Sequence, residues 1–222
     1  MSLILPFFAV FLGALLVFFG VAQSKVRLQL LLAFSGAFLL ATTITVVLPE
    51  IFSHGNGFIS YWILVGIVIQ IILENLTHGA EHGHLHINSS KKIPWVLIVG
   101  IYLHAFIEGL PIHHHEELLW AVVVHKLPIA MLITAALWQT KASKTSKLLI
   151  LFGFGIMTPL GSLINTNLPF LHSYTQEITA LVAGVLLHIS TTILFESAEN
   201  HKFKTSKIIA ILLGLGLVVL MV

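Results

Sequence analysis

Two apolar stretches of the chain, 93–112 and 118–138, carry ionisable side chains within their length. His104 and Glu108 lie four residues apart in the first stretch, a spacing that puts both side chains on one face of a helix. His125 lies in the second stretch, and the connection is short enough to make the two stretches an antiparallel helical hairpin. Two imidazoles and a carboxylate suit Zn²⁺, Fe²⁺, Mn²⁺, Co²⁺ or Ni²⁺ and leave a coordination position open. The pattern therefore predicts a site that binds and releases a divalent metal ion.

Other chemistries are compatible with the same residues. His104 and His125 as neutral core histidines, bonded to backbone carbonyls, are one alternative, and bis-histidine ligation of a haem is another. A third is an integral-membrane metallohydrolase, in which zinc activates a water for attack on a lipid amide. The absence of Asp and the placement of the candidate ligands within one hairpin argue against this hydrolase. We expect the protein not to be an enzyme and to hold no prosthetic group.

The elements that must position these residues are membrane helices. Of the 222 residues, 57% are hydrophobic and 9% charged, with a mean hydropathy of +1.01, whereas soluble domains carry about 25% charged residues. A formal net charge of +2 without a basic stripe argues against a nucleic-acid partner. The chain has no Cys, which excludes disulfides and thiolate metal ligands. These values predict an all-α polytopic membrane protein whose main partner is the lipid bilayer.

About eight apolar runs are long enough to cross a bilayer, for which a helix needs about 20 residues. They leave little chain for loops, so we expect one transmembrane domain over 1–222. The first run lacks the positively charged start of a signal peptide, and we expect it to remain as a span. The runs are 3–22, 29–49, 58–76, 93–112, 118–138, 147–165, 177–196 and 206–222.

The basic residues indicate how these spans are oriented. Of the 11 Lys and Arg, all but Lys126 fall in the connections after the first, third, fifth and seventh spans. Because basic loops stay in the cytoplasm, the pattern predicts that these four connections lie inside and both termini outside. The ten residues are Lys25, Arg27, Lys91, Lys92, Lys141, Lys144, Lys147, Lys202, Lys204 and Lys207.

The hairpin carries the motifs of a known family. His104-Ala-Phe-Ile-Glu108-Gly109 resembles the fourth-helix motif His-Asn-x-x-Glu-Gly of ZIP metal transporters. His125-Lys-Leu-Pro128 resembles their fifth-helix motif, which is His, an acid or amide, any residue and Pro. The resemblance covers essentially the whole chain and implies helices arranged as three, two and three, with outer triplets related by an inverted repeat. Further matches are Gly36–Ala41 with Leu48-Pro49-Glu50, Met157–Gly161 and Ala183–Leu187.

The sequence departs from the family pattern where many members bind a second metal. The resemblance implies that this metal is held by the motif Asn, the motif acid and a Glu of the sixth helix; these positions are Ala105, Lys126 and Thr158 here. A further ligand position of the first site is Ile129. We therefore hypothesise that the Lys126 ammonium takes the place of the second metal and neutralises Glu108 when the primary site is empty. The main alternative is a Lys126 side chain that snorkels to the outer surface of the membrane.

Several histidines lie outside the hairpin. His78, His82, His84 and His86 fall within a predicted cytoplasmic loop, 78–92, where they are a plausible loose chelator of metal. The run His113-His114-His115-Glu116-Glu117 lies at the outer mouth, where it concentrates cations or forms an inert polar turn. His188 and Glu196 share a face of the seventh span and are secondary candidates for an inner half-channel, whereas Glu50 and Glu74 are expected at the water interface.

Together these features predict a gradient-driven carrier that moves a divalent cation, Zn²⁺ or else Fe²⁺, Mn²⁺ or Co²⁺, into the cytoplasm. Its ligands would be His104, Glu108 and His125, and uptake should weaken as falling pH protonates the imidazoles. A non-transporting, metal-sensing relative remains an alternative, given the lost second site. We expect a cell-membrane location, in the inner membrane of a bacterium, and a homodimer is compatible with the sequence.

Overall fold

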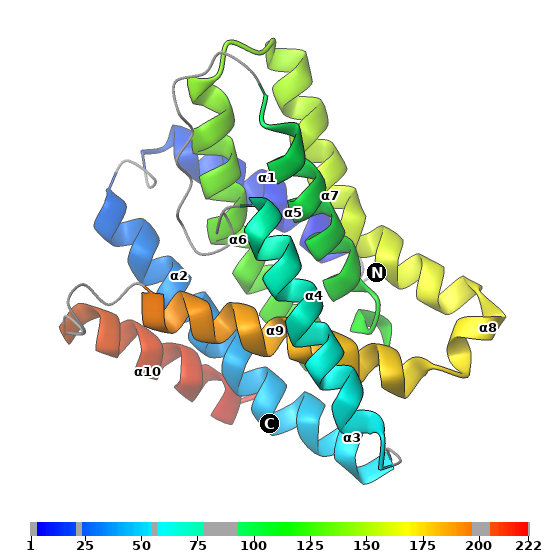
Figure 1. Ribbon diagram of the computed structural model, residues 1–222. Helices are drawn as coiled ribbons and strands as arrows, with labels where there is room; N and C mark the ends of the chain where they lie inside the picture. The colour runs from blue at the N-terminus through cyan, green and yellow to red at the C-terminus, as the bar shows by residue number, and fades with distance from the viewer. Residues whose placement is uncertain (1–3, 21–23, 55–56, 78–92, 197–204, 222) are drawn as a thin grey trace.

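The computed structural model describes residues 4–20, 24–54, 57–77, 93–196 and 205–221, and within these ranges every regular element is a helix (Figure 1). The all-α prediction is therefore confirmed for this part of the chain. The longer helices are α1 (Leu5–Phe18), α2 (Lys25–Thr42), α4 (Ile59–Thr77), α5 (Trp95–Gly109), α6 (Glu116–Gln139), α7 (Lys144–Asn167), α9 (Thr175–Glu196) and α10 (Thr205–Val219). Shorter elements are the π-helical segment η3 (Thr43–Val47), α3 (Leu48–His54), the 3₁₀ turn η5 (Ile112–His114) and α8 (Pro169–His172).

Five helices are long and apolar enough to cross a membrane, which agrees with a multi-pass membrane protein. Each of the eight predicted intervals contains a helix, but α1, α5 and α10 have only 14, 15 and 15 residues. The interval 93–112 is helical in α5 only as far as Gly109, and Pro111 in the following turn cannot donate the next helical hydrogen bond. The five longer helices are Val26–Ser53, Ile59–Thr77, Glu116–Gln139, Lys144–Asn167 and Thr175–Phe195.

The second of the predicted spans is one long helix with a π-helical segment in its middle. The helices α2 and α3 are joined through η3, where the Thr43 hydroxyl donates to the Leu39 carbonyl at 2.8 Å and the Thr45 hydroxyl to the Ala41 carbonyl at 2.8 Å. Pro49 follows directly and removes one backbone donor, a known cause of helix distortion. The distortion lies just before Glu50 and so sets the direction in which that side chain leaves the helix.

The helices pack in four principal pairs: α4 with α9, α2 with α10, α1 with α6, and α5 with α7. Glycines let the backbones approach closely in each pair, as is usual between membrane helices. The pairing also has a symmetry. Exchanging α1, α2 and α4 in order with α7, α9 and α10, and α5 with α6, maps these pairs onto one another. The glycines are Gly66 and Gly184 (α4–α9), Gly214 (α2–α10), Gly13 (α1–α6), and Gly109 and Gly161 (α5–α7).

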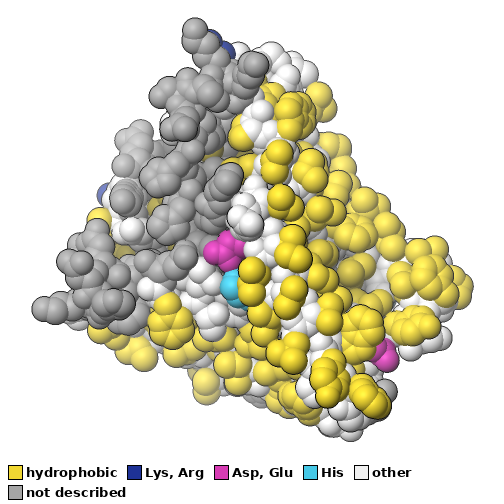
Figure 2. All heavy atoms as spheres, viewed as in Figure 1, with side chains coloured by type: hydrophobic (Ala, Val, Ile, Leu, Met, Phe, Trp, Pro, Cys, Tyr) yellow, Lys and Arg dark blue, Asp and Glu magenta, His cyan; other side chains and the backbone are white. Residues whose placement is uncertain are grey.

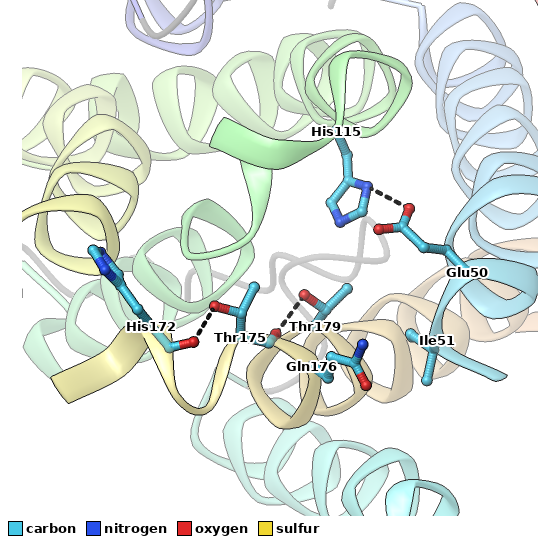
Figure 3. Close-up of a pocket in the computed structure, with 7 residues that line it drawn as sticks. All are labelled: Glu50, Ile51, His115, His172, Thr175, Gln176 and Thr179. Atoms are coloured by element: carbon cyan, nitrogen blue, oxygen red, sulfur yellow. Dashed lines mark hydrogen bonds and ion pairs between the residues drawn. The ribbon is translucent and has the colours of Figure 1, made fainter. Parts of the chain in front are cut away.

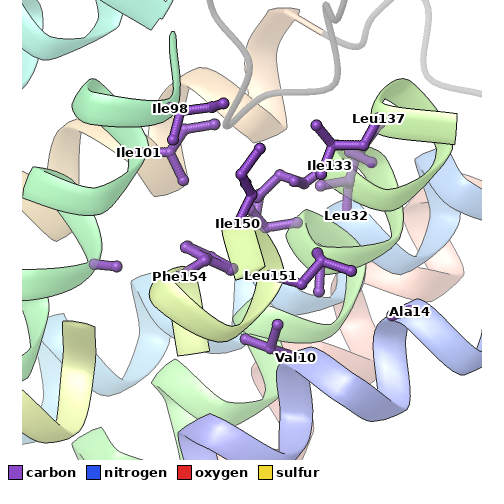
Figure 4. Close-up of a cluster of buried hydrophobic side chains, with 14 of the residues drawn as sticks. Val10, Ala14, Leu32, Ile98, Ile101, Ile133, Leu137, Ile150, Leu151 and Phe154 are labelled. Carbon is purple, nitrogen blue, oxygen red and sulfur yellow. The ribbon is translucent and has the colours of Figure 1, made fainter. Parts of the chain in front are cut away.

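Two apolar clusters fill the interior. One joins α1, α2, α5, α6, α7 and α9 through residues such as Val10, Ile101 and Phe154 (Figure 4). The other joins the continuous helix formed by α2, η3 and α3 to α6, α9 and the end of α10. Large apolar side chains such as Phe8, Leu64 and Leu212 are also exposed on the outside, and the described side chains on the face in Figure 2 are mostly hydrophobic. An apolar exterior of this kind fits a protein surrounded by lipid.

Candidate functional site

The ionisable side chains of α5 lie in the interior of the bundle. His104 and Glu108 are 2% and 1% exposed, and Nε2 of His104 lies 3.4 Å from Oε2 of Glu108. Two donors on one tetrahedral Zn²⁺, each about 2.0–2.1 Å from the ion, are roughly 3.3–3.4 Å apart. The Nδ1 atom of His104 is buried without a hydrogen bond among the described residues. One helix face thus presents an imidazole and a carboxylate at the spacing of two ligands on one ion.

Glu108 is already held by a cation of the protein itself. Nζ of Lys126, on α6, donates a hydrogen bond to Oε1 of Glu108 within an ion pair, and the Lys126 side chain is only 2% exposed. The ammonium also lies 4.7 Å from the ring centroid of Phe154 on α7, a favourable cation–π distance. Because an unpaired charge at this depth costs several kcal/mol, each partner makes the burial of the other tolerable.

Thr158 of α7 completes the surroundings of the carboxylate. Its Oγ1 lies 3.0 Å from Oε1 of Glu108 and 2.9 Å from the carbonyl oxygen of Ala105, so the hydroxyl hydrogen can be donated to either. The contact depends on two glycines, since a Cβ on Gly109 would meet the Thr158 carbonyl and one on Gly161 the Phe106 carbonyl. The close approach of α5 and α7 therefore sets the distance between Thr158 and Glu108.

The third predicted ligand is nearby but does not close a metal site. The ring of His125 is buried and perpendicular to that of His104, with 6.5 Å between the centroids. Among the residues that the structure describes, no three His, Asp or Glu side chains are grouped so that they could hold a metal ion. The side chains of Ala105 and Ile129, at two ligand positions implied by the family resemblance, are buried hydrocarbon. The site therefore consists of the Glu108 carboxylate, which is paired with Lys126, and the imidazoles of His104 and His125 beside it.

A second carboxylate–imidazole pair lies at the predicted outer end, and sequence reasoning missed it. His115, which follows η5, is 5% exposed, and its Nδ1 lies 3.1 Å from Oε2 of Glu50. His113, which we singled out at the outer mouth, is exposed instead. The side chain of His114, another of the predicted residues, lies outside the description. The run of three histidines was a signal for this pair, but its partner is 65 residues earlier in the chain.

A third pair lies between α4 and α9. Nε2 of His188 is 2.5 Å from Oε2 of Glu74, and both side chains are about one-fifth exposed (21% and 23%). Gln70, one turn before Glu74, is fully buried, and its amide atoms make no hydrogen bond among the described residues. Sequence reasoning named His188 but left Glu74 at the water interface and passed over Gln70. The side chain of Glu196 and the loop with His78, His82, His84 and His86 lie outside the described residues.

Comparison with protein families gives one finding. A family model described as ZIP zinc transporter matches residues 77–222, about two-thirds of the chain. The match includes the α5–α6 hairpin, α7 and α9, which carry all the central residues described above. A comparison with curated proteins finds no match.

Proposed function

The chain belongs to the ZIP zinc transporter family, and from this premise we propose that it carries Zn²⁺, or another divalent cation of similar chemistry, into the cytoplasm. Membership of this family indicates transport of divalent metal cations as the general activity, and it indicates a transporter and not an enzyme. The observation that carries the proposal is the buried His104–Glu108 pair, whose donor atoms are 3.4 Å apart, as on one ion. Imidazole and carboxylate favour Zn²⁺ and its borderline neighbours over Ca²⁺ or Mg²⁺.

The proposed ligands are His104, Glu108 and His125, with the metal ion as cargo. A small movement of α6 relative to α5 brings the His125 imidazole toward the other two donors, which are on one face of α5. Pro128, one turn after His125, leaves a backbone carbonyl of α6 without its helical donor. Such an interruption makes this part of the helix the natural place for that movement.

Lys126 has a defined role in this proposal. In the metal-free carrier its ammonium neutralises Glu108, so that a carrier without cargo holds no net charge at this pair. An arriving cation competes with the ammonium for the carboxylate and releases it. After the cation leaves, Lys126 rebinds Glu108 and stabilises the empty carrier for its return. Because the ammonium takes the second-metal position implied by the family resemblance, we propose one metal ion at this cluster.

The rival that has an observation in its favour is a metal-binding relative that does not transport. Its support is the same ion pair, because a carboxylate fixed by Lys126 and Thr158 is less available to a metal. The two proposals differ in turnover: a carrier releases its cargo on the other side, whereas a sensor only binds it.

Uptake into proteoliposomes loaded with a metal-sensitive dye decides between them. The wild-type chain should give saturable uptake of Zn²⁺, and His104→Ala should abolish it while still inserting into the membrane. Lys147→Met is the matched control, since Lys147 is also buried but its Nζ donates to the Thr140 carbonyl at 3.0 Å, remote from Glu108. Wild-type protein that binds Zn²⁺ without carrying it would favour the sensor.

The proposed topology is eight spans with both termini outside, in a three, two and three arrangement related by an inverted repeat. Support comes from the eight helices in the predicted intervals and from the symmetric pairing of α4–α9 with α2–α10. The absence of Cys makes the test clean, because a single introduced cysteine is the only thiol. Ser143→Cys should react with an impermeant reagent only from the cytoplasm, and Ser173→Cys only from outside. We further propose that this membrane is the inner membrane of a bacterium. We also propose a homodimer as the assembly, which the oligomeric state in detergent would test.

On the cytoplasmic side, we propose that Glu74 and His188 receive the released ion. They form a carboxylate–imidazole pair that is partly exposed, so that a bound ion keeps access to water. The predicted chelating loop over 78–92 begins directly after α4, which carries Glu74. Deleting 78–86 should change the capacity or regulation of transport and not abolish it.

A further inference from the structure

A cavity of about 420 Å³ lies at the end of the bundle where α3, the start of α6, α8 and α9 meet (Figure 3). Its walls are polar for a chain of this composition, and Glu50 is the one carboxylate among the lining residues that the structure describes. None of these lining residues is Lys or Arg, in contrast to the buried site around Glu108. They are Glu50, Ile51, His115, His172, Thr175, Gln176 and Thr179.

The ligand-bearing wall consists of Glu50 and His115, whose side chains point toward one another in Figure 3. The distance of 3.1 Å between Nδ1 of His115 and Oε2 of Glu50 falls in the range for two donors on one ion. Ligand atoms about 2.0–2.1 Å from a metal ion are roughly 3.0–3.4 Å apart, depending on the angle between the bonds. The pair therefore has a donor-to-donor spacing that two ligands of one ion can share.

His115 is fixed in place by its backbone. Its N–H donates to the Ile112 carbonyl at 3.3 Å, and its carbonyl accepts from the Leu119 N–H at 3.1 Å, as the residue ends η5 and begins α6. The side chain is buried, whereas that of Glu50 is 51% exposed. A rigid imidazole beside a solvated carboxylate is suited to meet an ion that arrives from water.

The opposite wall offers oxygen atoms and space for water. Thr179 donates its hydroxyl hydrogen to the Thr175 carbonyl at 2.8 Å, which leaves lone pairs of its Oγ1 on the cavity side as acceptors (Figure 3). The ring of His172 is engaged elsewhere, since its Nε2 lies 3.1 Å from the Thr166 carbonyl oxygen. Because a water molecule takes about 30 Å³, the cavity admits a cation together with several of its waters.

We propose that this cavity is a second metal site, in which Glu50 and His115 bind a divalent cation of the Zn²⁺ class and water completes its coordination. Two protein ligands give weak and quickly reversible binding, which suits a site that captures cargo before it reaches Glu108. His115 lies seven residues after Glu108, at the end of the hairpin that α5 and α6 form. The capture role rests on the proposed uptake function, but cation binding in the cavity does not.

Binding is tested with Co²⁺ on the full-length protein in detergent, because the visible absorption of Co²⁺ reports ligands directly. In a His104→Ala, His125→Ala background, which disables the central site, Glu50→Gln and His115→Asn should each lower bound Co²⁺ by one ion per chain. Glu50→His should retain the ion, since it exchanges one ligand for another. Glu177→Gln is the matched control, because this carboxylate is next to the lining residue Gln176 but is not itself a lining residue.

Uptake measurements with the central ligands intact then test capture. Glu50→Gln and His115→Asn should raise KM for Zn²⁺ about tenfold and leave the maximal rate unchanged, with monodisperse protein as the check on folding. Equal Co²⁺ binding by Glu50→Gln, His115→Asn and Glu177→Gln would overturn the site. Loss of the ion without a rise in KM would overturn the capture role. Neither result would touch the assignment of the central ligands, whose loss is expected to remove the maximal rate.

Discussion

Two of the carboxylate–imidazole pairs among the described residues have nearly equal spacing in very different surroundings. Glu108 and His104 are 3.4 Å apart and almost fully buried, whereas Glu50 and His115 are 3.1 Å apart and the Glu50 side chain is 51% exposed. The buried carboxylate is held by a lysine, Lys126, whereas no Lys or Arg is among the described residues that line the cavity beside Glu50. The half-exposed Glu50 side chain is open to solvent that can stabilise its charge, whereas Glu108 is buried and is paired with a cation. We therefore propose that burial, more than ligand type, separates a site that exchanges cations from one that only collects them.

The largest difference between the two pairs is expected when the carboxylates are neutralised one at a time. Glu108→Gln leaves the Lys126 ammonium buried without its partner, which should lower the free energy of unfolding by about 3–5 kcal/mol and abolish saturable uptake. Glu50→Gln should change stability by less than about 1 kcal/mol and keep the maximal rate. Thermal unfolding in detergent and uptake at saturating Zn²⁺ measure the two effects. Similar destabilisation by both variants would show that burial does not distinguish the two carboxylates.

Removing the lysine should be the next largest effect. Lys126→Met leaves Glu108 without its counter-ion, so the empty carrier should be destabilised by about 3 kcal/mol and multiple-turnover uptake should slow about tenfold. A single metal ion should still bind at the cluster. The double variant Glu108→Gln, Lys126→Met removes both charges and should regain most of the lost stability, but not transport. Additive losses in the double variant would show that the two residues are not coupled.

A smaller effect is expected from forcing α5 away from α7. Gly109→Ala introduces a Cβ against the Thr158 carbonyl, so the helices must separate and the hydroxyl contact to Glu108 is lost. We expect a loss of about 1–3 kcal/mol, as for overpacked cores, and reduced uptake. Gly216→Ala on α10 is the matched control, since a Cβ there meets no atom within 4 Å. If Gly109→Ala behaves like Gly216→Ala, the close approach is not needed for the site.

The smallest effect should come from the hydroxyl of Thr158. Thr158→Val keeps the shape of the side chain but removes its hydrogen bond to Glu108, which should cost about 1 kcal/mol. The affinity for metal should rise slightly, because the carboxylate then has one competitor fewer. Isothermal titration with Zn²⁺ against the wild-type chain measures the change. A tenfold or greater loss of affinity would mean that Thr158 is itself a ligand.

Local spacing accounts for what could be predicted from the sequence. The separation of four residues put His104 and Glu108 on one face, and the family motifs drew attention to Lys126 and Thr158 before their contacts with Glu108 were known. The pairs Glu50–His115 and Glu74–His188 could not be predicted, because their members are 65 and 114 residues apart. Their contacts depend on how each helix is rotated about its axis. Periodicity gives little information on that rotation when both the lipid and the core are apolar.

The boundaries of the helices were predicted less well than the presence of a helix in each apolar interval. The π-helical segment before Pro49 and the early end of α5 at Gly109 arise from missing backbone donors whose effect extends over several residues. The start of α7 at Lys144, three residues before the predicted interval, follows from a Ser143 cap, whose hydroxyl accepts from the Ser146 N–H at 3.1 Å. These local features do not change the pattern of apolar runs from which the spans were read.

We propose that Lys126 occupies the place of a second metal ion, so that one ion binds at Glu108. The decisive experiment is equilibrium metal counting on purified protein, with the wild-type chain compared with a His104→Ala, Glu108→Gln, His125→Ala variant and with Lys126→Asp. The triple substitution should remove one ion per chain, and Lys126→Asp should add one. A loss of two ions in the triple variant, or an unchanged count in Lys126→Asp, would show that Lys126 does not stand in for a metal ion.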